Sequence, residues 1–269
     1  MPFATILLDA LPWLIGVWLF AFGGAIGSFL NVVVYRVPAG ISLVHPGSHC
    51  PRCKTPIRWS DNVPIFGWLF LRGRCRACNG AISARYPTVE AVTATMFVVL
   101  GLAESVPYGI DPTATAEQTV AELWGVYSYH LLLLCTLLAA VGIEFDGHRV
   151  APRLFAPATI AGLAAPVFWP YLHGVHACSA MPAGLAGIAD GPTGLAAGLL
   201  CGWGASRVCR TGRAGLICGL GVAGLFLGWQ AVVVLAVVVG AVCLLPAARR
   251  RQTPILWLTV ATFVWILII

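Results

Sequence analysis

The chain has 269 residues, of which 59% are hydrophobic and only 10% are charged, and its mean hydropathy is +0.88. A soluble globular protein of this length needs more charge on its surface, so the composition excludes that class and predicts an integral membrane protein. The net charge of +6 does not indicate nucleic-acid binding, because the cations lie in connections between apolar runs and not on one basic face.

The first apolar segment, 11–35, carries no charge over 25 residues and is long enough to cross about 30 Å of hydrocarbon. The first cation, Arg36, follows it, which favours an uncleaved anchor with an outward N-terminus over a cleaved signal peptide. Further apolar segments lie at 88–103, 124–143, 154–172, 192–206, 214–229, 230–247 and 254–269.

These segments predict an all-α, polytopic membrane helix bundle of about eight transmembrane helices. We divide the chain into a first transmembrane helix at 1–35, a polar loop at 36–87 and a membrane helix bundle at 88–269. The lipid bilayer is thus an expected partner, and nucleic acid is not.

The positive charges alternate along this map of spans. All 16 Lys and Arg residues fall in every second connection, at Arg36, Arg52, Lys54, Arg58, Arg72, Arg74, Arg76, Arg85, Arg149, Arg153, Arg207, Arg210, Arg213, Arg249, Arg250 and Arg251. The intervening connections carry no cation, and their acids are Asp9, Glu104, Asp111, Glu117, Glu122 and Asp190. Because cytoplasmic loops are enriched in Lys and Arg, we expect the loop 36–87 in the cytoplasm and both termini outside.

Four cysteines dominate that loop. Cys50-Pro-Arg-Cys53 is followed, after 21 residues, by Cys75-Arg-Ala-Cys78. Two Cys-x2-Cys pairs at this separation are typical of a structural zinc site, and a reducing cytoplasm disfavours disulfides. Four thiolates leave no open position for water, so the zinc would fold a ribbon-like loop and would not catalyse a reaction. The alternative is a loop without zinc that packing alone holds together.

The other cysteines lie singly in or beside apolar segments. We expect each of them to be buried and to pack as a small hydrophobic residue. They are Cys135, Cys178, Cys201, Cys209, Cys218 and Cys243. His173 and His176 precede Cys178 closely enough to suggest a metal site in an outer connection, but so short a set is more often incidental.

Glycines in the C-terminal half include Gly219, Gly221 and Gly224, which match the G-x-G-x-x-G dinucleotide fingerprint. No predicted strand precedes them and no acid follows about 20 positions later, so we reject a cofactor site. Gly194 and Gly198 have the spacing of small residues at contacts between membrane helices. We therefore expect these glycines, with Gly202, to bring helices close together.

Acidic residues at a membrane are energetically expensive and indicate function. Glu90 lies at the cytoplasmic start of the second predicted span, and Glu144 and Asp146 lie at the cytoplasmic end of the third. Asp190 opens the fifth span on the outer side, and no acid follows it. Glu144 and Asp146 are therefore the candidate catalytic acids.

The motifs of the first third of the chain resemble those of bacterial type IV prepilin peptidases. The resemblance runs through Gly27-Ser-Phe-Leu-Asn31, Tyr35-Arg-Val-Pro38, Ser42-Leu-Val-His-Pro46, the four cysteines, Asp61-Asn-Val-Pro64 and Ile82-Ser-Ala-Arg-Tyr86-Pro-Thr-Val-Glu90, and resumes at Phe226-Leu-Gly-Trp229. It implies an aspartic membrane protease of the bacterial inner membrane that cuts the leader from pilin-like or pseudopilin precursors at the cytoplasmic face. Many members also methylate the new N-terminus with S-adenosylmethionine.

The carboxylate pair that the resemblance implies is incomplete. Glu144 and Asp146 match the surroundings of the first family aspartate, although neither has its spacing to the following proline, Pro152. Counting back from Trp229 to the second family motif, Leu216 stands in place of the aspartate and Cys218 in place of the lysine. Because two carboxylates together activate water and protonate the leaving amine, this substitution predicts weak peptidase activity.

Two classes of function follow from these residues. The first is a prepilin peptidase-like endopeptidase with an atypical arrangement of acids. The second is a non-proteolytic relative that binds pilin-like signal helices as an assembly factor or methyltransferase. A membrane-anchored zinc-ribbon scaffold unrelated to the family is the remaining alternative.

Overall fold

The computed structural model describes residues 2–104, 116–169, 172, 183–209, 213–245 and 254–268. Within these ranges the regular structure is helical, which confirms the predicted all-α class. The chain divides into two compact units, unit 1 at Met1–Val106 and unit 2 at Pro107–Ile269.

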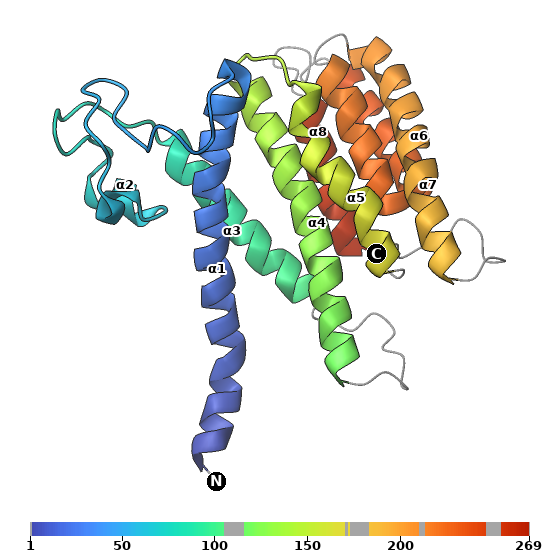
Figure 1. The fold of residues 1–269 in the computed structure, drawn as a ribbon, viewed down its shortest axis with the longest axis horizontal. Coiled ribbons are helices and arrows are strands. Elements are labelled where there is room, and N and C mark those ends of the chain that lie inside the picture. The colour runs from blue at the N-terminus through green and yellow to red at the C-terminus, as the bar shows by residue number, and fades with distance from the viewer. Residues whose placement is uncertain are drawn as a thin grey trace. The chain divides into compact units, whose positions relative to one another are not determined.

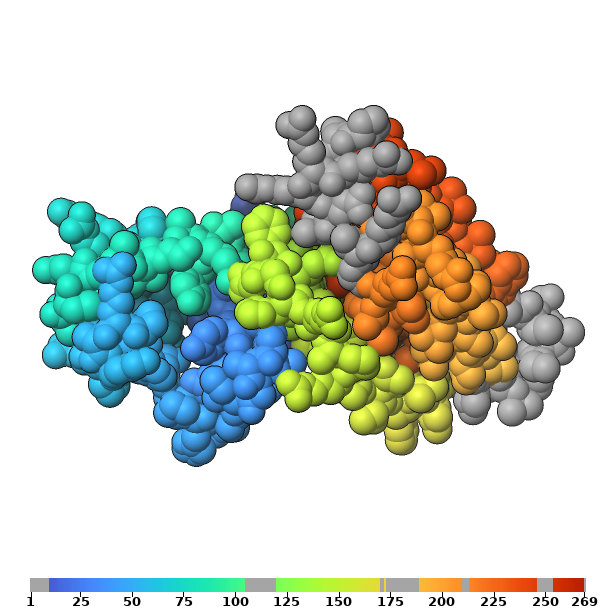
Figure 2. Space-filling model, turned by 90° about the horizontal axis from the view of Figure 1, so that it is seen from above, coloured from blue at the N-terminus to red at the C-terminus, as the bar shows by residue number. Residues whose placement is uncertain are grey.

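Unit 1 contains two antiparallel helices, α1 (Pro2–Ala39) and α3 (Arg85–Glu104), joined by the loop that carries the four cysteines (Figure 1). That loop includes the short helices η1 (Trp59–Asn62) and α2 (Phe66–Phe70). In the space-filling view it forms the outer edge of unit 1, in light blue to teal (Figure 2).

Glycines let α1 and α3 approach closely. A Cβ atom at Gly23 would lie 2.9 Å from the Cα of Ala94, and one at Gly27 would lie 2.7 Å from the Cα of Glu90. Only a residue without a side chain permits such contacts between backbones, as is common for membrane helices. The contact of Gly27 with Glu90 also shows which part of α1 lies beside the start of α3, where the loop ends.

Unit 2 is a bundle of helices (Figure 1). They are α4 (Ala116–Phe145), η2 (Pro152–Leu154), α5 (Ala156–Phe168), α6 (Ala183–Cys209), α7 (Arg213–Leu244) and α8 (Pro254–Ile268). The most extensive interface joins α6 to α7. Gly194, Gly198 and Gly202 lie in it, which confirms that these glycines bring helices together.

Helix α7 is interrupted at Gly228, whose φ of 84° and ψ of 169° lie in a region that side chains forbid. A Cβ atom at Gly224 would lie 2.8 Å from the Cγ2 of Val232. Residues eight positions apart cannot touch on one straight helix, because they are about 12 Å apart along its axis. The chain therefore turns back at Gly228, which gives the two predicted segments 214–229 and 230–247 as the arms of a hairpin.

The hairpin leaves carbonyl groups at the end of its first arm without helical partners. The hydroxyl of Tyr129, on α4, donates to the carbonyl oxygens of Leu225 at 3.3 Å and of Gly162 at 3.4 Å. The ring of Tyr129 stacks on Phe226, with the two centroids 4.1 Å apart. One tyrosine thus joins α4, α5 and α7 beside the turn. It also donates a hydrogen bond to a carbonyl group for which lipid offers no donor.

Four helices of the described chain are long and apolar enough to cross a membrane by length and composition, at Ala10–Ala39, Arg85–Glu104, Val120–Phe145 and Arg213–Leu244. The last of these is the helix that the turn at Gly228 divides into two arms. Ala156–Phe168 and Pro254–Ile268 are apolar but shorter. Each of the eight predicted segments overlaps a helix. The helices do not confirm a count of eight spans, and that number stays a prediction.

Replacing Gly198 with alanine is expected to destabilise unit 2. The added Cβ would collide with the backbone of α7, where the Cα of Gly221 lies 2.8 Å from its position. Such overpacking costs about 1–3 kcal/mol. The matched control is Gly204→Ala in the same helix, where nothing lies within 4 Å of the new Cβ. Thermal unfolding in detergent should show a lower midpoint for Gly198→Ala and an unchanged or higher one for Gly204→Ala; equal midpoints would contradict the tight α6–α7 contact.

Candidate functional site

The two cysteine pairs occupy matching turns of the backbone. In the first turn, the N–H of Lys54 donates to the carbonyl of Cys50 at 2.9 Å; in the second, the N–H of Asn79 donates to the carbonyl of Cys75, also at 2.9 Å. Lys54 and Asn79 both have positive φ angles, of 59° and 54°. Two turns of one shape thus present two cysteines each to a common centre.

The four sulfur atoms lie within 4.8 Å of one another. The Sγ atoms of Cys50 and Cys78 are 3.9 Å apart, and those of Cys53 and Cys75 are 4.0 Å apart. A tetrahedral ion with metal–sulfur bonds of about 2.3 Å requires sulfurs about 3.8 Å apart. The predicted four-cysteine cluster is therefore present, and its geometry fits one metal ion.

The charge state of the cluster also favours a cation. Hydrogen bonds between Cys53 and Thr55 lower the pKa of Cys53 to about 6, and hydrogen bonds with the backbone of Cys78 and Ala77 lower the pKa of Cys75. A backbone hydrogen bond from Gly80 has the same effect on Cys78, but contacts with the neighbouring thiols outweigh it and raise its pKa to about 11. Four thiolates this close together would repel one another, and a bound cation would offset that repulsion.

Side chains outside the cluster fix the loop that carries it. Arg36, at the end of α1, donates to the carbonyl oxygens of Ser42 and Pro46 at 2.8 and 2.5 Å. Arg76 forms a bidentate pair with Asp61 of η1, at 2.8 and 2.5 Å, and this pair holds the pKa of Asp61 below its usual value. The second cysteine turn is therefore tied to η1, and the first part of the loop to α1.

Glu90 anchors the loop to the helix pair. Its carboxylate accepts a hydrogen bond of 2.7 Å from the backbone N–H of Ile65, and its side chain is 9% exposed. Ile65 has a φ of 64°, which is rare for a β-branched residue and persists only where surrounding contacts impose it. The sequence identified Glu90 as an expensive acid, and the structure shows that it positions the loop.

The end of α4 places Glu144 inside unit 2. Gly147, with a φ of 77°, ends the helix, and the N–H of His148 closes its last turn on the carbonyl of Ile143 at 3.1 Å. One carboxylate oxygen of Glu144 accepts from the N–H of Ile255, at the start of α8, at 3.4 Å. The other oxygen is buried and has no hydrogen-bond partner among the described residues.

The other candidate acid lies elsewhere. Asp146 follows the end of α4, and its side chain is exposed. The structure thus separates the environments of the two acids that the sequence could not distinguish, with Glu144 turned into the bundle and Asp146 turned out of it.

The start of α7 contacts the residue that binds Glu144. A Cβ atom at Gly215 would lie 2.6 Å from the Cδ1 of Ile255, the residue whose N–H binds Glu144. The adjacent Leu216 is completely buried. The starts of α7 and α8 therefore meet the end of α4, and the residue that follows Gly215 there is hydrophobic.

Asp190 does not complete a pair with Glu144. It lies in the first half of α6, before the glycines that contact the first arm of α7, and it is buried. Gly194 meets Gly224 near the far end of that arm, whereas Leu216 begins it. Asp190 and Glu144 are thus at opposite ends of unit 2.

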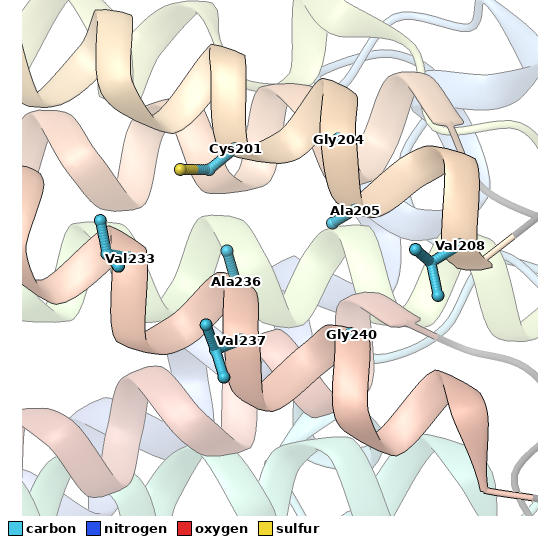
Figure 3. Close-up of a pocket in the computed structure, with 8 residues that line it drawn as sticks. All are labelled: Cys201, Gly204, Ala205, Val208, Val233, Ala236, Val237 and Gly240. Atoms are coloured by element: carbon cyan, nitrogen blue, oxygen red, sulfur yellow. The ribbon is translucent and has the colours of Figure 1, made fainter.

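A cavity of about 320 Å³ lies between α6 and the second arm of α7 (Figure 3). Cys201, Ala205, Val233 and Gly240 are among its lining residues, all of which are small or apolar. The lining residues carry no carboxylate or imidazole group, and Cys201 supplies their one thiol.

One expectation about the single cysteines is wrong. Cys209, at the end of α6, forms a disulfide with Cys243, at the end of the second arm of α7, with Cα atoms 5.4 Å apart. The sequence could not show that the hairpin brings the two ends together. Cys135, Cys201 and Cys218 are free and partly buried. Cys178, His173 and His176 lie outside the described residues.

Comparisons with known proteins agree with the motifs in the chain. Residues 21–103 match the family model of the bacterial peptidase A24 N-terminal domain. A prepilin leader peptidase/N-methyltransferase of Klebsiella pneumoniae is 36% identical over 234 residues, which cover 82% of this chain and 88% of that protein. One from Aeromonas salmonicida (strain A449) is 33% identical over 275 residues, with 88% and 84% covered.

A type 4 prepilin-like proteins leader peptide-processing enzyme of Escherichia coli O78:H11 is 45% identical over 98 residues, which cover 30% of this chain and 36% of that protein. No solved structure matches the chain significantly. The identity to the Klebsiella protein extends over most of both chains. The chain therefore belongs to the family of prepilin leader peptidases/N-methyltransferases.

Proposed function

We propose that this chain recognises prepilin-like proteins in the membrane but cleaves their leaders slowly or not at all. The family relation supports recognition, because the relatives are named for acting on prepilins. The observation that carries the second half is the buried Leu216 at the start of α7, because paired-carboxylate chemistry needs a second acid there. A single carboxyl cannot hold both the proton and the negative charge that the reaction requires.

The hydrogen bond of Glu144 in the described structure also indicates a structural role for this residue. The last turn of a helix carries partial negative charge, so a glutamate there is unfavourable unless it has a compensating partner. The N–H of Ile255, at the positive start of α8, supplies that partner. We infer that Glu144 now helps to hold α4 against α8.

An active endopeptidase with an atypical arrangement of acids is the second candidate function. It rests on the buried oxygen of Glu144 that has no partner, since an unsatisfied carboxyl oxygen is available to a substrate or a water molecule. In this candidate Glu144 is the first acid, and Asp146, two positions later, supplies the second. Its requirement is that Asp146 turn inward when the prepilin binds.

Methylation extends the proposal. The relatives' names include N-methyltransferase, so methylation of a prepilin N-terminus is a proposed activity of this chain as well. S-adenosylmethionine is the methyl donor that such an activity would use. Methyl transfer does not need the carboxylate pair, so the loss at Leu216 leaves it untouched.

We also propose that the ion held by Cys50, Cys53, Cys75 and Cys78 is zinc. Four thiolates in tetrahedral geometry suit Zn²⁺, and every ligand position is taken. The ion would hold the two cysteine turns together and leave the chemistry to other residues.

The test of function uses the full chain in proteoliposomes with a prepilin whose leader carries a photoreactive group in its apolar segment. Crosslinking to this chain without leader cleavage, with the Klebsiella relative as the cleaving control, is the expected result. Rapid cleavage would overturn the proposal that the leader is cut slowly or not at all. Failure to crosslink would contradict the proposal that this chain recognises prepilins. Mass spectrometry of the prepilin N-terminus, started from pre-cleaved prepilin, reports methylation separately.

Topology is a separate prediction. The charge map places the loop between α1 and α3 and the ends of α4 and α6 in the cytoplasm, and both termini outside. A reporter fused after Arg251 should therefore indicate the cytoplasm, and one inserted near Asp111 should indicate the outer side. The reverse pattern at either position would contradict the predicted sidedness.

A further inference from the structure

The α2 surface, defined by Trp59, Phe66, Leu69 and Phe70, is an exposed apolar patch on the four-cysteine loop. Trp59 is 87% exposed and Phe70 is 80% exposed. The rings of Phe66 and Phe70 lie on one side of α2, with centroids 6.4 Å apart. The opposite side of α2 packs inward, because Gly67 is buried against η1 and Trp68 donates to the carbonyl of Ile82 at 3.0 Å. An outward apolar patch of this size indicates an interaction surface.

The level of α2 along the helix pair indicates what covers it. The residue before α2, Ile65, is bound to Glu90, and Glu90 contacts Gly27 of α1. Gly27 precedes the first cation, Arg36, by nine residues, or roughly 13 Å along the helix. On α3, Glu90 follows Arg85 by five residues, or roughly 7 Å. The start of α2 therefore lies on the apolar side of the first charges of both helices.

A second contact shows the same depth. A Cβ atom at Gly24 would lie 3.3 Å from the Cβ of Pro64, so the chain just before α2 reaches even further down α1. Figure 1 shows α2 beside the helix pair and not beyond the end of α1. Helices that lie in a membrane interface bury their apolar face about 5–10 Å into the boundary between headgroups and acyl chains. The loop thus carries α2 back to the membrane that α1 and α3 cross.

Charges around the patch complement anionic lipid. Arg58 precedes Trp59, and Arg72 and Arg74 follow α2; all three are exposed. Aromatic side chains beside exposed arginines are typical of segments at the level of lipid headgroups. We propose that the α2 surface is embedded in the headgroup layer of the same bilayer, with Arg58, Arg72 and Arg74 on anionic phospholipid headgroups. The four-cysteine loop then lies along the membrane surface, held by lipid on one side and by Glu90 on the other.

Photocrosslinking in nanodiscs tests this placement. Phe70 is replaced by p-benzoylphenylalanine in the full chain, which is assembled with phosphatidylglycerol and phosphatidylcholine, irradiated and measured by intact mass. The matched control carries the same group at Val44, which is 72% exposed but lies between two residues bound by Arg36 at the end of α1. We expect lipid adducts at position 70 in a yield several-fold above that at position 44.

Three outcomes would overturn the proposal. They are equal yields at the two positions, no lipid adduct at position 70, and adducts to a second copy of the chain in place of lipid. If the chain with the group at position 70 does not assemble, the same group is placed at Phe66, on the same face of α2, and the yield of lipid adducts there is compared with the yield at position 44. The variant Arg72→Glu/Arg74→Glu should lower the yield of the phosphatidylglycerol adduct several-fold and leave the yield of the phosphatidylcholine adduct unchanged. An equal effect on both lipids would show that these arginines do not bind anionic headgroups.

Discussion

Changing Cys75 to serine is expected to abolish metal binding and to unfold the loop between α1 and α3. A serine hydroxyl is a poor ligand for Zn²⁺, and the remaining three thiolates leave the tetrahedral site open. The two cysteine turns gain little from packing, since Cys53 and Cys78 are exposed. Structural zinc sites contribute about 10–16 kcal/mol of binding free energy at neutral pH, far more than such a loop gains by packing.

Metal analysis and limited proteolysis measure this effect. The native chain, purified without chelator, should contain about one zinc per chain, and Cys75→Ser should contain none. Trypsin should cut the variant quickly at Arg52, Lys54 and Arg72, which are exposed in the loop. The control Cys201→Ser removes a thiol that lines the cavity in unit 2 and should keep both the metal and the resistance. Metal-free native chain with an intact loop would show that packing alone holds it.

Native chain is expected to cleave a prepilin at a rate on the order of 10²–10⁴-fold below that of a relative with both acids, because one general acid–base partner is missing. Leu216→Asp combined with Cys218→Lys should restore part of the rate. The new carboxyl would lie beside Gly215, whose neighbour Ile255 already contacts Glu144. Adding Glu144→Asp should raise the rate further, since glutamate is one carbon longer than aspartate.

The control for this rescue is Leu216→Asn combined with Cys218→Lys. Asparagine matches aspartate in size and also buries a polar group where Leu216 is fully enclosed, so it should destabilise unit 2 to a similar degree. It cannot exchange a proton with Glu144 and should restore no cleavage. Leader cleavage is followed by the mass of the prepilin. Robust cleavage by the native chain that Glu144→Gln or Asp146→Asn abolishes would instead establish the second candidate function.

Local sequence was sufficient for much of the fold. Apolar runs predicted the long helices, because the hydrocarbon of a membrane requires each span to satisfy its own backbone hydrogen bonds. The spacing of Cys50, Cys53, Cys75 and Cys78 predicted their cluster, since a Cys-x2-Cys turn presents two sulfurs to one side whatever surrounds it. The spacing of Gly194, Gly198 and Gly202 predicted a helix contact for a similar reason, as residues four apart lie on one face.

Other features depended on which distant segments meet. The sequence treated Glu144 and Asp146 as equal candidates, and only the packing of α8 against α4 separates the acid that binds Ile255 from the exposed one. The disulfide between Cys209 and Cys243 depends in the same way on the reversal of the chain at Gly228.

Sequence alone thus determined the membrane class, the long helices and the cysteine cluster, because each of these depends on residue type and on spacing within a short stretch. Tertiary structure decided which partner Glu144 binds, how deeply Glu90 holds the loop beside α1, and which cysteines pair. Those outcomes depend on contacts between residues 25 to 111 positions apart. The periodicity of a single helix carries no information about such contacts, since they form only when separate elements pack together.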